Sequence, residues 1–463
     1  MRGVVGMRLG HLEASLASRN IDANAKNYLP RVAINPSALA RKARVIRWKA
    51  AAPQTALSHN SATLASDLGV MRLHRAPLPQ NRHRTRFPSM RNVPAATYRL
   101  PMTSATLLGY YGNANIGDDV FCEVFTAKLR EAGYSHIFAP NAADALSQRL
   151  RLDNQTSTRR AIEQSHAVVV GGGGILGRGV LSPQPYADLE YYHKVSLFCR
   201  LRGRSLVLLG VGAGPLETRR AKRIVRRIVS NATLVHARDK VSFQCLQNIK
   251  GINQRKILLA GDPATALDYS GLTDTSRPII IPKSRPCIGI NLFPFTGFAS
   301  GPPMDSIHED IIAWVDKALA TNLIRSVIWF STNPGRSEML LNYRAYERFN
   351  GSSSLVVYNG NPWSWVKTLG VCDSFLSMKL HSGVFAAGMT VPLMGIGYHP
   401  KIERFYRALG LLDYYLPCDE VGTNSVQRFL DRAFPGARSV NTSDAWLQEA
   451  QRADSALRGI PSL

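Results

Sequence analysis

The chain has 463 residues, of which 45% are apolar and 19% charged, a balance typical of globular proteins. This length allows two domains of ordinary size and excludes disorder of the whole chain. The formal net charge of +25 indicates anionic ligands or an anionic surface as partners. No apolar run approaches the ~18 residues that a membrane-spanning helix needs, so we do not expect the chain to cross a membrane.

The six cysteines are far apart in the sequence, with no C-x-x-C pair and no cysteine–histidine cluster at zinc-ligand spacing. They are Cys122, Cys199, Cys245, Cys287, Cys372 and Cys418. We therefore predict reduced thiols in a cytoplasmic protein that holds no metal and no cofactor. Arg8 and Glu13 interrupt the start of the chain, which argues against a secretory signal peptide.

Residues 1–101 form a basic segment that we predict to be a disordered extension. They contain 17 basic and three acidic residues, which account for +14 of the net charge. They show neither helical nor strand periodicity and are rich in Arg, Ser, Ala, Asn and Pro. Two interpretations remain open: a basic arm that contacts a membrane or nucleic acid, or an extension without a function.

From residue 102 onward, short apolar runs that end in glycine alternate with helical periodicity. This pattern predicts an N-terminal Rossmann-like domain with parallel strands over residues 102–272. After a proline-rich linker, residues 273–286, the same rhythm predicts a C-terminal Rossmann-like domain over residues 287–425, and residues 426–463 are predicted to be helical. The predicted strands are residues 105–111, 167–170, 205–210, 233–237, 256–259, 287–291, 326–330, 355–358, 374–377 and 393–396.

Residues 109–119, G-Y-Y-G-N-A-N-I-G-D-D, form an unusually long glycine-rich turn before a predicted helix over 120–132. Its glycines allow a close backbone approach, and the amides at the start of the helix favour an anion. We interpret this turn as a ligand-binding loop, with a plain strand-to-helix turn as the alternative. The candidate substrate-binding residues are Gly112, Asn113, Asn115, Gly117 and Asp118.

Residues 168–177, V-V-V-G-G-G-G-I-L-G, supply a second glycine-rich turn. Gly172, Gly174 and Gly177 fit the G-x-G-x-x-G pattern of dinucleotide-binding sites. That fingerprint also requires an acidic residue at the end of the next strand, which here ends in G-V-G-A-G-P, so a dinucleotide cofactor is disfavoured. The candidate substrate-binding residues of these two turns are Gly172, Gly173, Gly174 and Gly212.

The run T-R-R-A-K-R-I-V-R-R-I-V, residues 218–229, predicts a helix with one apolar stripe and one arginine-rich face. A solvated basic face on a core-packed helix is the simpler interpretation. Peripheral contact with the inner face of an anionic membrane is the alternative.

Two further segments carry candidate catalytic residues. Arg238 ends a predicted parallel strand, from which a guanidinium reaches a carboxylate or phosphate in the ligand crevice; a structural pair with Asp239 is the alternative. Lys379 and His381 lie at a strand-to-helix junction, and Ser382 is a candidate substrate-binding residue that opens the helix. A cation, an imidazole and helix-terminal amides thus converge, which suits anion binding and proton transfer.

Taken in order, these motifs resemble the polysaccharide pyruvyl transferase family, over residues 107–412 and outside residues 1–101. The resemblance rests on the two glycine-rich turns and on four further segments. These are L-G-V-G-A-G-P-L (209–216), A-R-D-K-V-S (237–242), A-G-D-P-A-T-A-L (260–267), and K-L-H-S through Y-H-P-K-I-E-R-F (379–405). The resemblance implies a glycosyltransferase-B-like fold, in which two Rossmann-like domains face each other across a cleft that holds the active site. The family motif usually reads R-L-H, so Lys379 stands where the family has Arg.

The resemblance further implies transfer of pyruvate from phosphoenolpyruvate to a sugar hydroxyl pair, forming a ketal in bacterial exopolysaccharide or cell-surface polysaccharide. Arg238 and Lys379 would bind the donor's carboxylate and phosphate, and His381 would donate a proton while titrating near neutral pH. Asp118, Asp119 and Asp262 are candidates for the base by motif membership alone. The sequence leaves open the acceptor sugar, its hydroxyl pair and its attachment to a lipid carrier.

Two other functions fit parts of the sequence. A nucleotide-sugar-dependent glycosyltransferase of the same fold would bind a nucleoside diphosphate sugar in place of phosphoenolpyruvate. A nucleic-acid-binding protein would account for the net charge, but the larger part of the basic excess lies outside the predicted domains, and no stripe of interleaved aromatic and basic residues is present. We therefore expect no nucleic-acid partner.

Overall fold

The computed structural model describes most of the chain beyond residue 103. The described residues are 104–177, 184–214, 216–269, 278–294, 304–418, 421, 425–437, 439 and 443–461. All described residues belong to one compact unit. The predicted extension therefore lies outside the described residues, as does part of the predicted linker.

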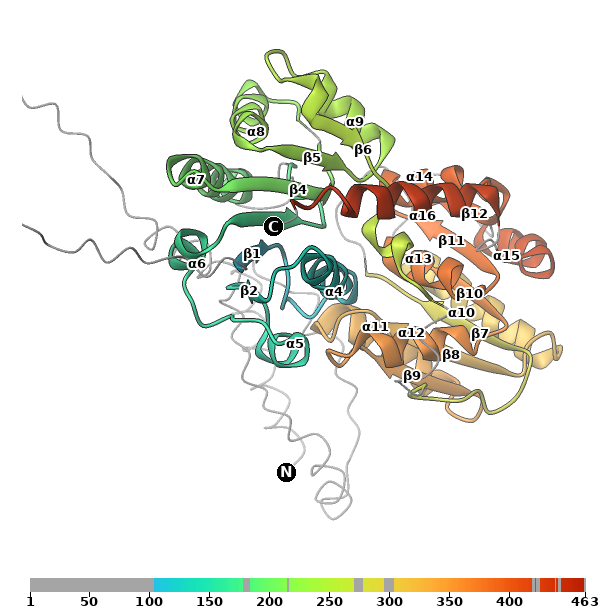
Figure 1. The fold of residues 1–463 in the computed structure, drawn as a ribbon. Helices are drawn as coiled ribbons and strands as arrows, with labels where there is room; N and C mark the ends of the chain where they lie inside the picture. Colours follow the sequence, from blue (N-terminus) through green and yellow to red (C-terminus); the bar gives the residue numbers. More distant parts are fainter. Residues whose placement is uncertain are drawn as a thin grey trace, which may run out of the picture. The chain divides into compact units, whose positions relative to one another are not determined.

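Two six-stranded parallel sheets organise the described chain (Figure 1). The first has the strand order β2-β1-β3-β4-β5-β6, and the second has the order β12-β11-β10-β7-β8-β9. The strands of the first sheet are β1 (Ser104–Leu108), β2 (His136–Phe138), β3 (Ala167–Gly171), β4 (Ser205–Val211), β5 (Leu234–Ala237) and β6 (Ile257–Leu259). Those of the second are β7 (Cys287–Asn291), β8 (Ser326–Ser331), β9 (Ser353–Val357), β10 (Ser374–Ser377), β11 (Leu393–Gly397) and β12 (Tyr415–Pro417).

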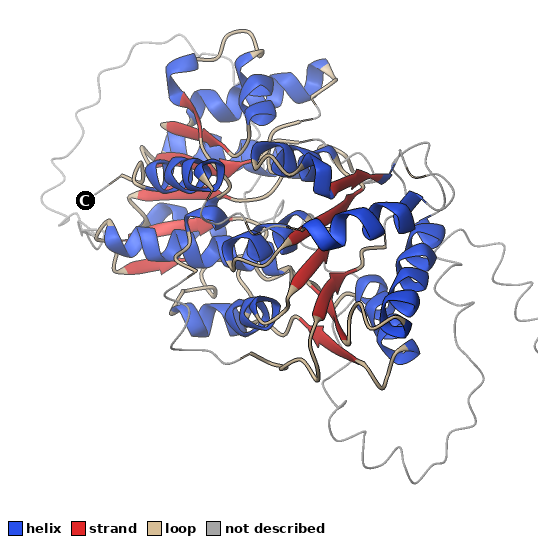
Figure 2. Cartoon of the chain, turned by 90° about the vertical axis from the view of Figure 1, so that its right-hand side faces the viewer, coloured by secondary structure: helices blue, strands red, loops and turns tan. Residues whose placement is uncertain are grey.

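Helices cover both faces of each sheet (Figure 2). Beside the first sheet lie α4 (Ile116–Glu131), α5 (Asp144–Leu150), α6 (Thr158–Gln164), α7 (Ala187–Leu201), α8 (Arg219–Asn231) and α9 (Lys240–Gln247), with the short 3₁₀ turns η2 (Gln254–Lys256) and η3 (Pro263–Ala266). The part of the chain that forms the second sheet contributes α10 (Met304–Ala320), α11 (Arg336–Arg348), α12 (Pro362–Gly370), α13 (Leu380–Gly388), α14 (Pro400–Ala408), η5 (Leu412–Tyr414) and α15 (Ser425–Gly436). The chain ends with α16 (Asp444–Leu457).

The predicted fold class, two Rossmann-like α/β units, is confirmed by these sheets. Strands such as β3 and β7 are buried at every residue, because helices cover both faces of a parallel sheet and leave no solvent-facing side. This explains why their sequences are continuous apolar runs and do not alternate. The predicted domain boundaries themselves stay predictions. The six cysteines form no disulfide bond in the structure.

Several predicted boundaries differ from the structure. Helix α4 begins at Ile116, four residues before the predicted start, because the Ile116 amide donates a hydrogen bond to the Thr332 carbonyl beyond β8. Gly117 and Asp118 therefore lie in the first helical turn and not in a loop. Strands β2 and β12 were not predicted, since three residues are too few to show a strand pattern.

The C-terminal helix α16 packs against η3 and against β4 of the first sheet. Trp446 and Leu457 bury their side chains in the core there. A Cβ at Gly261 would overlap with the Glu449 carbonyl oxygen, so only glycine allows the helix to approach the turn before Asp262.

Candidate active site

Each sheet has one point at which its strand order reverses direction, and such points form ligand crevices at the carboxyl ends of the strands. In the first sheet this point lies between β1 and β3, whose following turns are the two predicted glycine-rich motifs. In the second sheet it lies between β7 and β10, and Lys379 and His381 directly follow β10. Contacts between the described side chains bring these two points together.

One of these contacts joins the N-terminus of α4 to His381 of α13. A Cβ at Gly117 would overlap with Nδ1 of the imidazole, so the ring lies directly on the helix backbone. The Phe121 ring packs edge-to-face against the same imidazole, with 5.0 Å between centroids. His381 is thus held between two elements that are far apart in the sequence.

The charges around His381 disfavour its protonated form. Burial, followed by the positive charges of Arg238, Lys401 and Lys379, holds the pKa of His381 well below its usual range. Nε2 of His381 lies 3.8 Å from Oδ2 of Asp262. Both atoms are buried without a hydrogen-bond partner among the described residues. The surroundings therefore favour the neutral imidazole, in contrast to the prediction from the sequence that it titrates near neutral pH.

Arg238 extends from the end of β5 into the same region, and its side chain is only 9% exposed. Its guanidinium makes long ion pairs of 3.9 Å with both Asp239 and Asp262. A Cβ at Gly212 would lie 3.1 Å from Nη2 of Arg238, so the glycine leaves room for the guanidinium beneath the turn after β4. Neither ion pair is at hydrogen-bonding distance, and the guanidinium retains donors that an anion can use.

Lys401, at the start of α14, is a second cation in this region. It belongs to the sequence motif Y-H-P-K, for which no role was predicted. Burial, and then the charges of Arg238 and Lys379, lower its pKa to about 8, while Asp118 and Asp262 oppose this shift. Burial and neighbouring cations thus act in the same direction on this lysine. One feature of the sequence could have indicated Lys401 as a site residue. Like Lys379, it lies where a strand passes into a helix.

Asp118, in the first turn of α4, faces the second glycine-rich turn. Asn115 donates a hydrogen bond of 2.7 Å to its Oδ2. Its Oδ1 would lie 3.6 Å from a Cβ at Gly173, which has a positive φ of 71°. Burial raises the pKa of Asp118 to about 6, although the hydrogen bond from Asn115 and the charges of Lys401 and Arg238 oppose the shift. A carboxylate of this kind exchanges protons close to neutral pH.

The neighbouring Asp119 has a structural environment. Tyr358, which follows β9, donates a hydrogen bond of 2.6 Å to its Oδ2, and the Gly112 amide donates one of 3.2 Å to its Oδ1. A Cβ at Gly112 would lie 2.5 Å from the Ala143 nitrogen, so this glycine packs against the chain behind the turn. Asp119 and Gly112 therefore connect the two sheets and shape the loop.

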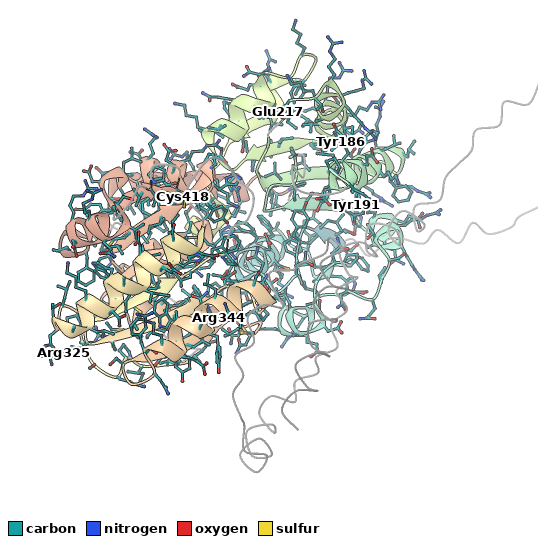
Figure 3. The ribbon with its side chains drawn as sticks, turned by 180° about the vertical axis from the view of Figure 1, so that it is seen from behind. Tyr186, Tyr191, Glu217, Arg325, Arg344 and Cys418 are labelled. Carbon is teal, nitrogen blue, oxygen red and sulfur yellow. The ribbon has the colours of Figure 1, made fainter. Side chains whose placement is uncertain are left out.

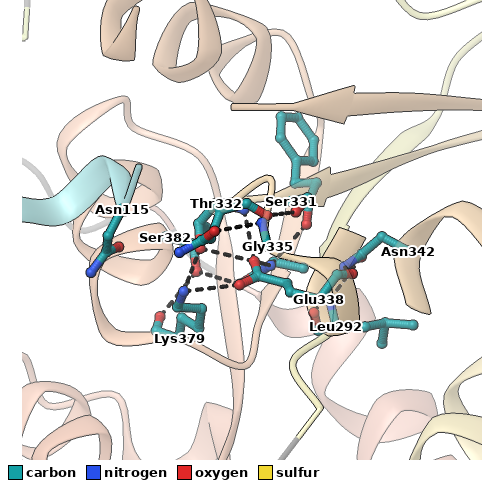
Figure 4. Close-up of polar contacts among 12 residues, drawn as sticks. Asn115, Leu292, Ser331, Thr332, Gly335, Glu338, Asn342, Lys379 and Ser382 are labelled. Carbon is teal, nitrogen blue, oxygen red and sulfur yellow. Dashed lines mark hydrogen bonds and ion pairs between the residues drawn. The ribbon is translucent and has the colours of Figure 1, made fainter. Parts of the chain in front are cut away.

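Lys379 belongs to a buried polar network on the side of the site that the second sheet forms (Figure 4). Its Nζ donates hydrogen bonds to Thr332 Oγ1 at 2.5 Å and to Glu338 Oε2 at 3.0 Å. Glu338 also accepts from Thr332 and Asn291. The carboxylate compensates the lysine charge, which makes Lys379 less available to a ligand than Arg238.

The remaining predicted site residues are Ser382, Gly172, Gly174 and Asn113, and none of them is shown in contact with the His381 imidazole. Ser382 is fully buried and bonds to Ser377, to Asn291 and to the Lys379 carbonyl, so it faces away from His381. Gly172 packs against Phe121, and a Cβ at Gly174 would meet no atom within 4 Å. Asn113 is exposed, and its carbonyl accepts a hydrogen bond of 3.5 Å from Asn333.

The structure thus gathers six of the candidate residues near a seventh, His381, and adds one residue that was missed. Around His381 lie Gly117, Asp118, Gly173, Gly212, Arg238 and Asp262, with Lys401 added. Within the described ranges, no group of three or more His, Cys, Asp or Glu side chains is arranged to hold a metal ion. None of the described helices is both long and apolar enough to span a membrane.

Comparison with known proteins found structural similarities at low sequence identity. No curated protein matches the sequence. Similar solved structures include Alr3699/HepE from Anabaena in complex with UDP, at 10% identity over 78% of this chain and 98% of that one, with a TM-score of 0.47. UDP-GlcNAc 2-epimerase from Methanocaldococcus jannaschii is similar at 12% identity over 77% and 99%, with a TM-score of 0.47. The corresponding epimerase from Neisseria meningitidis, bound to UDP-GlcNAc, is similar at 12% identity over 78% and 97%, with a TM-score of 0.45.

A family model described as polysaccharide pyruvyl transferase matches residues 115–400, which is more than half of the chain. The matched range includes Asp118, Arg238, Asp262 and His381 and ends directly before Lys401. The chain belongs to the polysaccharide pyruvyl transferase family.

Proposed function

We propose that the protein transfers pyruvate from phosphoenolpyruvate to two hydroxyls of one sugar, in the synthesis of an exopolysaccharide or a cell-surface polysaccharide. The observation that carries this proposal is the cluster of Arg238 and Lys401 around His381, with Asp118 and Asp262 beside it. Two cations suit a small donor that bears both a carboxylate and a phosphate. Phosphoenolpyruvate is an intracellular metabolite, so the proposed reaction belongs to the cytoplasm.

The reaction needs one proton donor and one proton acceptor. Protonation of the methylene carbon of phosphoenolpyruvate makes C2 electrophilic, and the oxygen of the first sugar hydroxyl forms a bond to C2 and loses its proton. The bond between C2 and the phosphate oxygen breaks, the second hydroxyl adds to C2, and its proton leaves with inorganic phosphate. The net products are the ketal, with a new methyl group, and phosphate.

His381 is the proton donor in this proposal, and the donor substrate itself supplies the condition for its protonation. In the free protein Arg238 and Lys401 help to lower the pKa of His381. A bound phosphate and carboxylate would neutralise these cations and raise that pKa. The imidazole then acquires its proton together with the substrate, which prevents an unpaired buried charge in the free site.

Asp118 is the proposed base for the sugar hydroxyl. Its pKa of about 6 leaves it mostly ionised at neutral pH while keeping it basic enough to accept a proton. Asp119 is less suitable, because both of its oxygens already accept hydrogen bonds from Tyr358 and Gly112. Asp262 lies beside Nε2 of His381 and is better placed to orient the imidazole.

Release of phosphate from phosphoenolpyruvate, measured with a panel of free and lipid-linked oligosaccharides, tests the proposal. We expect release that depends on an acceptor and that requires a higher concentration of phosphoenolpyruvate in Arg238→Ala. The same panel supplied with a nucleoside diphosphate sugar tests the glycosyltransferase alternative. Sugar transfer from that donor, without phosphate release from phosphoenolpyruvate, would overturn the proposal.

A further inference from the structure

Helix α8 presents a strongly basic face to solvent. Its apolar stripe packs into the core of the first sheet and consists of Ala221, Ile224, Val225, Ile228 and Val229. The exposed side chains on the opposite face include six cations and no acid: Arg219, Arg220, Lys222, Arg223, Arg226 and Arg227.

This arrangement does not stabilise the helix. Like charges stand three and four residues apart along the face, as at Lys222 and Arg226, and such pairs repel each other. Cations in the first turn, such as Arg219, also oppose the helix dipole. Of the six, only Arg220 has an ion-pair partner, Glu190, among the described residues. Local pairing therefore does not explain the basic face.

The adjacent helix α7 adds exposed apolar groups to the same surface. The two helices lie side by side. Arg200 of α7 donates a hydrogen bond to Asn231 of α8, Asn231 donates one to the Ser196 hydroxyl of α7, and Arg220 forms an ion pair with Glu190. On α7, Leu197 is 44% exposed and Leu201 is 73% exposed. We call this region the α7–α8 surface, and it comprises Lys194, Leu197 and Leu201 of α7 with the six cations of α8.

We propose that the α7–α8 surface docks on an anionic membrane. Six cations complement the phosphates of acidic lipids, and exposed leucines beside them enter the boundary between headgroups and acyl chains. Leucines contribute little to nucleic-acid binding, which uses aromatic side chains to stack on bases, so the pair of leucines favours the membrane. This inference does not depend on the reaction assigned to the site.

Docking there would also position the candidate active site. The α8 N-cap, Thr218, closes the short connection from β4 that contains Gly212, beside the Arg238 guanidinium. A protein bound through α8 would therefore hold this connection close to the membrane surface.

The test is co-sedimentation of the full chain with vesicles of phosphatidylcholine alone or mixed with phosphatidylglycerol. The variant Arg223→Gln/Arg226→Gln/Arg227→Gln removes three charges from α8. The matched control Arg325→Gln/Arg348→Gln/Arg432→Gln removes three exposed charges from the part of the chain that forms the second sheet. Figure 3 shows Arg325 well separated from Tyr186, over whose ring the Arg220 guanidinium lies. Both variants retain the same basic residues 1–101, so the comparison isolates the contribution of α8.

We expect salt-sensitive binding to the anionic vesicles only. Each cation near such a surface contributes roughly fivefold to binding, so the α8 variant should bind roughly a hundredfold more weakly while the control binds like the wild type. Leu197→Ser/Leu201→Ser should weaken vesicle binding by roughly tenfold without changing binding of a labelled single-stranded RNA.

Equal vesicle binding by the α8 variant and its control, with both folded by circular dichroism, would overturn the proposal. A loss of RNA binding in the α8 variant, with vesicle binding retained, would overturn it too and would assign the surface to nucleic acid.

Discussion

Nε2 of His381 and Oδ2 of Asp262 face each other at 3.8 Å, and both atoms are buried without a hydrogen-bond partner among the described residues. Burial shifts the two pKa values in opposite directions, lowering that of His381 and raising that of Asp262. Each group is therefore driven towards its neutral form in the free protein. A proton that the imidazole takes up with an anionic substrate would give an imidazolium, and this positive charge beside Asp262 would in turn lower the pKa of the carboxyl group.

Donor binding should therefore be coupled to proton uptake. Because bound phosphoenolpyruvate raises the pKa of His381, binding takes up protons near pH 7, and affinity falls as the pH rises through the pKa of the complex. Calorimetry in buffers of different ionisation enthalpy measures this uptake. His381→Asn should take up fewer protons at pH 7 and lose roughly a hundredfold to ten-thousandfold in single-turnover rate. A wild-type rate in this variant would remove His381 from the mechanism.

Gly117→Ala should damage turnover without unfolding the protein. The new methyl group would overlap with Nδ1 of His381 and displace the imidazole. We expect a drop in kcat of at least about tenfold, since even small displacements of catalytic groups are costly. Gly351→Ala is the matched control, because a Cβ there meets no atom within 4 Å. Equal kcat values for both variants would show that the imidazole is not positioned by α4.

Arg238→Ala should weaken binding of phosphoenolpyruvate by about 1.5 to 3 kcal/mol, the range for a lost charge-assisted hydrogen bond. Arg238→Lys keeps the charge but not the planar fork and should fall between the alanine variant and the wild type. Arg325→Ala, at an exposed site, serves as the control. An unchanged dissociation constant in Arg238→Ala would demote this residue to a structural role.

Lys379→Gln should act mainly on stability. It leaves the carboxylate of Glu338, whose side chain is 4% exposed, without its cation, and breaking a buried pair costs about 3 to 5 kcal/mol. Glu338→Gln should destabilise to a similar degree, although it removes the opposite charge. Urea unfolding of both variants and of the double variant measures the coupling. A stable Lys379→Gln variant with weakened donor binding would instead support Lys379 as a ligand to the donor.

Asp118→Asn should lose turnover and gain stability. The pKa of Asp118 is raised from 3.8 to about 6, so its contribution to stability is fully present below about pH 4 and is lost as the pH rises through 6. Removing the charge should therefore raise the melting temperature at pH 8 and change it little at pH 4. A lower melting temperature of Asp118→Asn at pH 8 would contradict this prediction. It would show that neighbouring groups stabilise the ionised carboxylate by more than burial destabilises it.

Local sequence determined the secondary-structure framework of this protein. The apolar runs that became β3, β7 and β10 were predicted to within a residue, because burial on both faces requires them to be apolar throughout. The positions of Arg238 and His381 followed from the same reasoning, since parallel strands direct their carboxyl ends to one edge of the sheet.

Only the tertiary structure decided how those residues are paired and charged. Lys379 and His381 lie two positions apart, yet one is compensated by Glu338 of α11 and the other lies on Gly117 of α4, and these helices accompany different sheets. Lys401 acquires its lowered pKa from charges that approach it only in the folded chain. No periodicity records such contacts, because they depend on the packing of elements far apart in sequence, and pKa values follow from burial and neighbouring charges that only this packing creates.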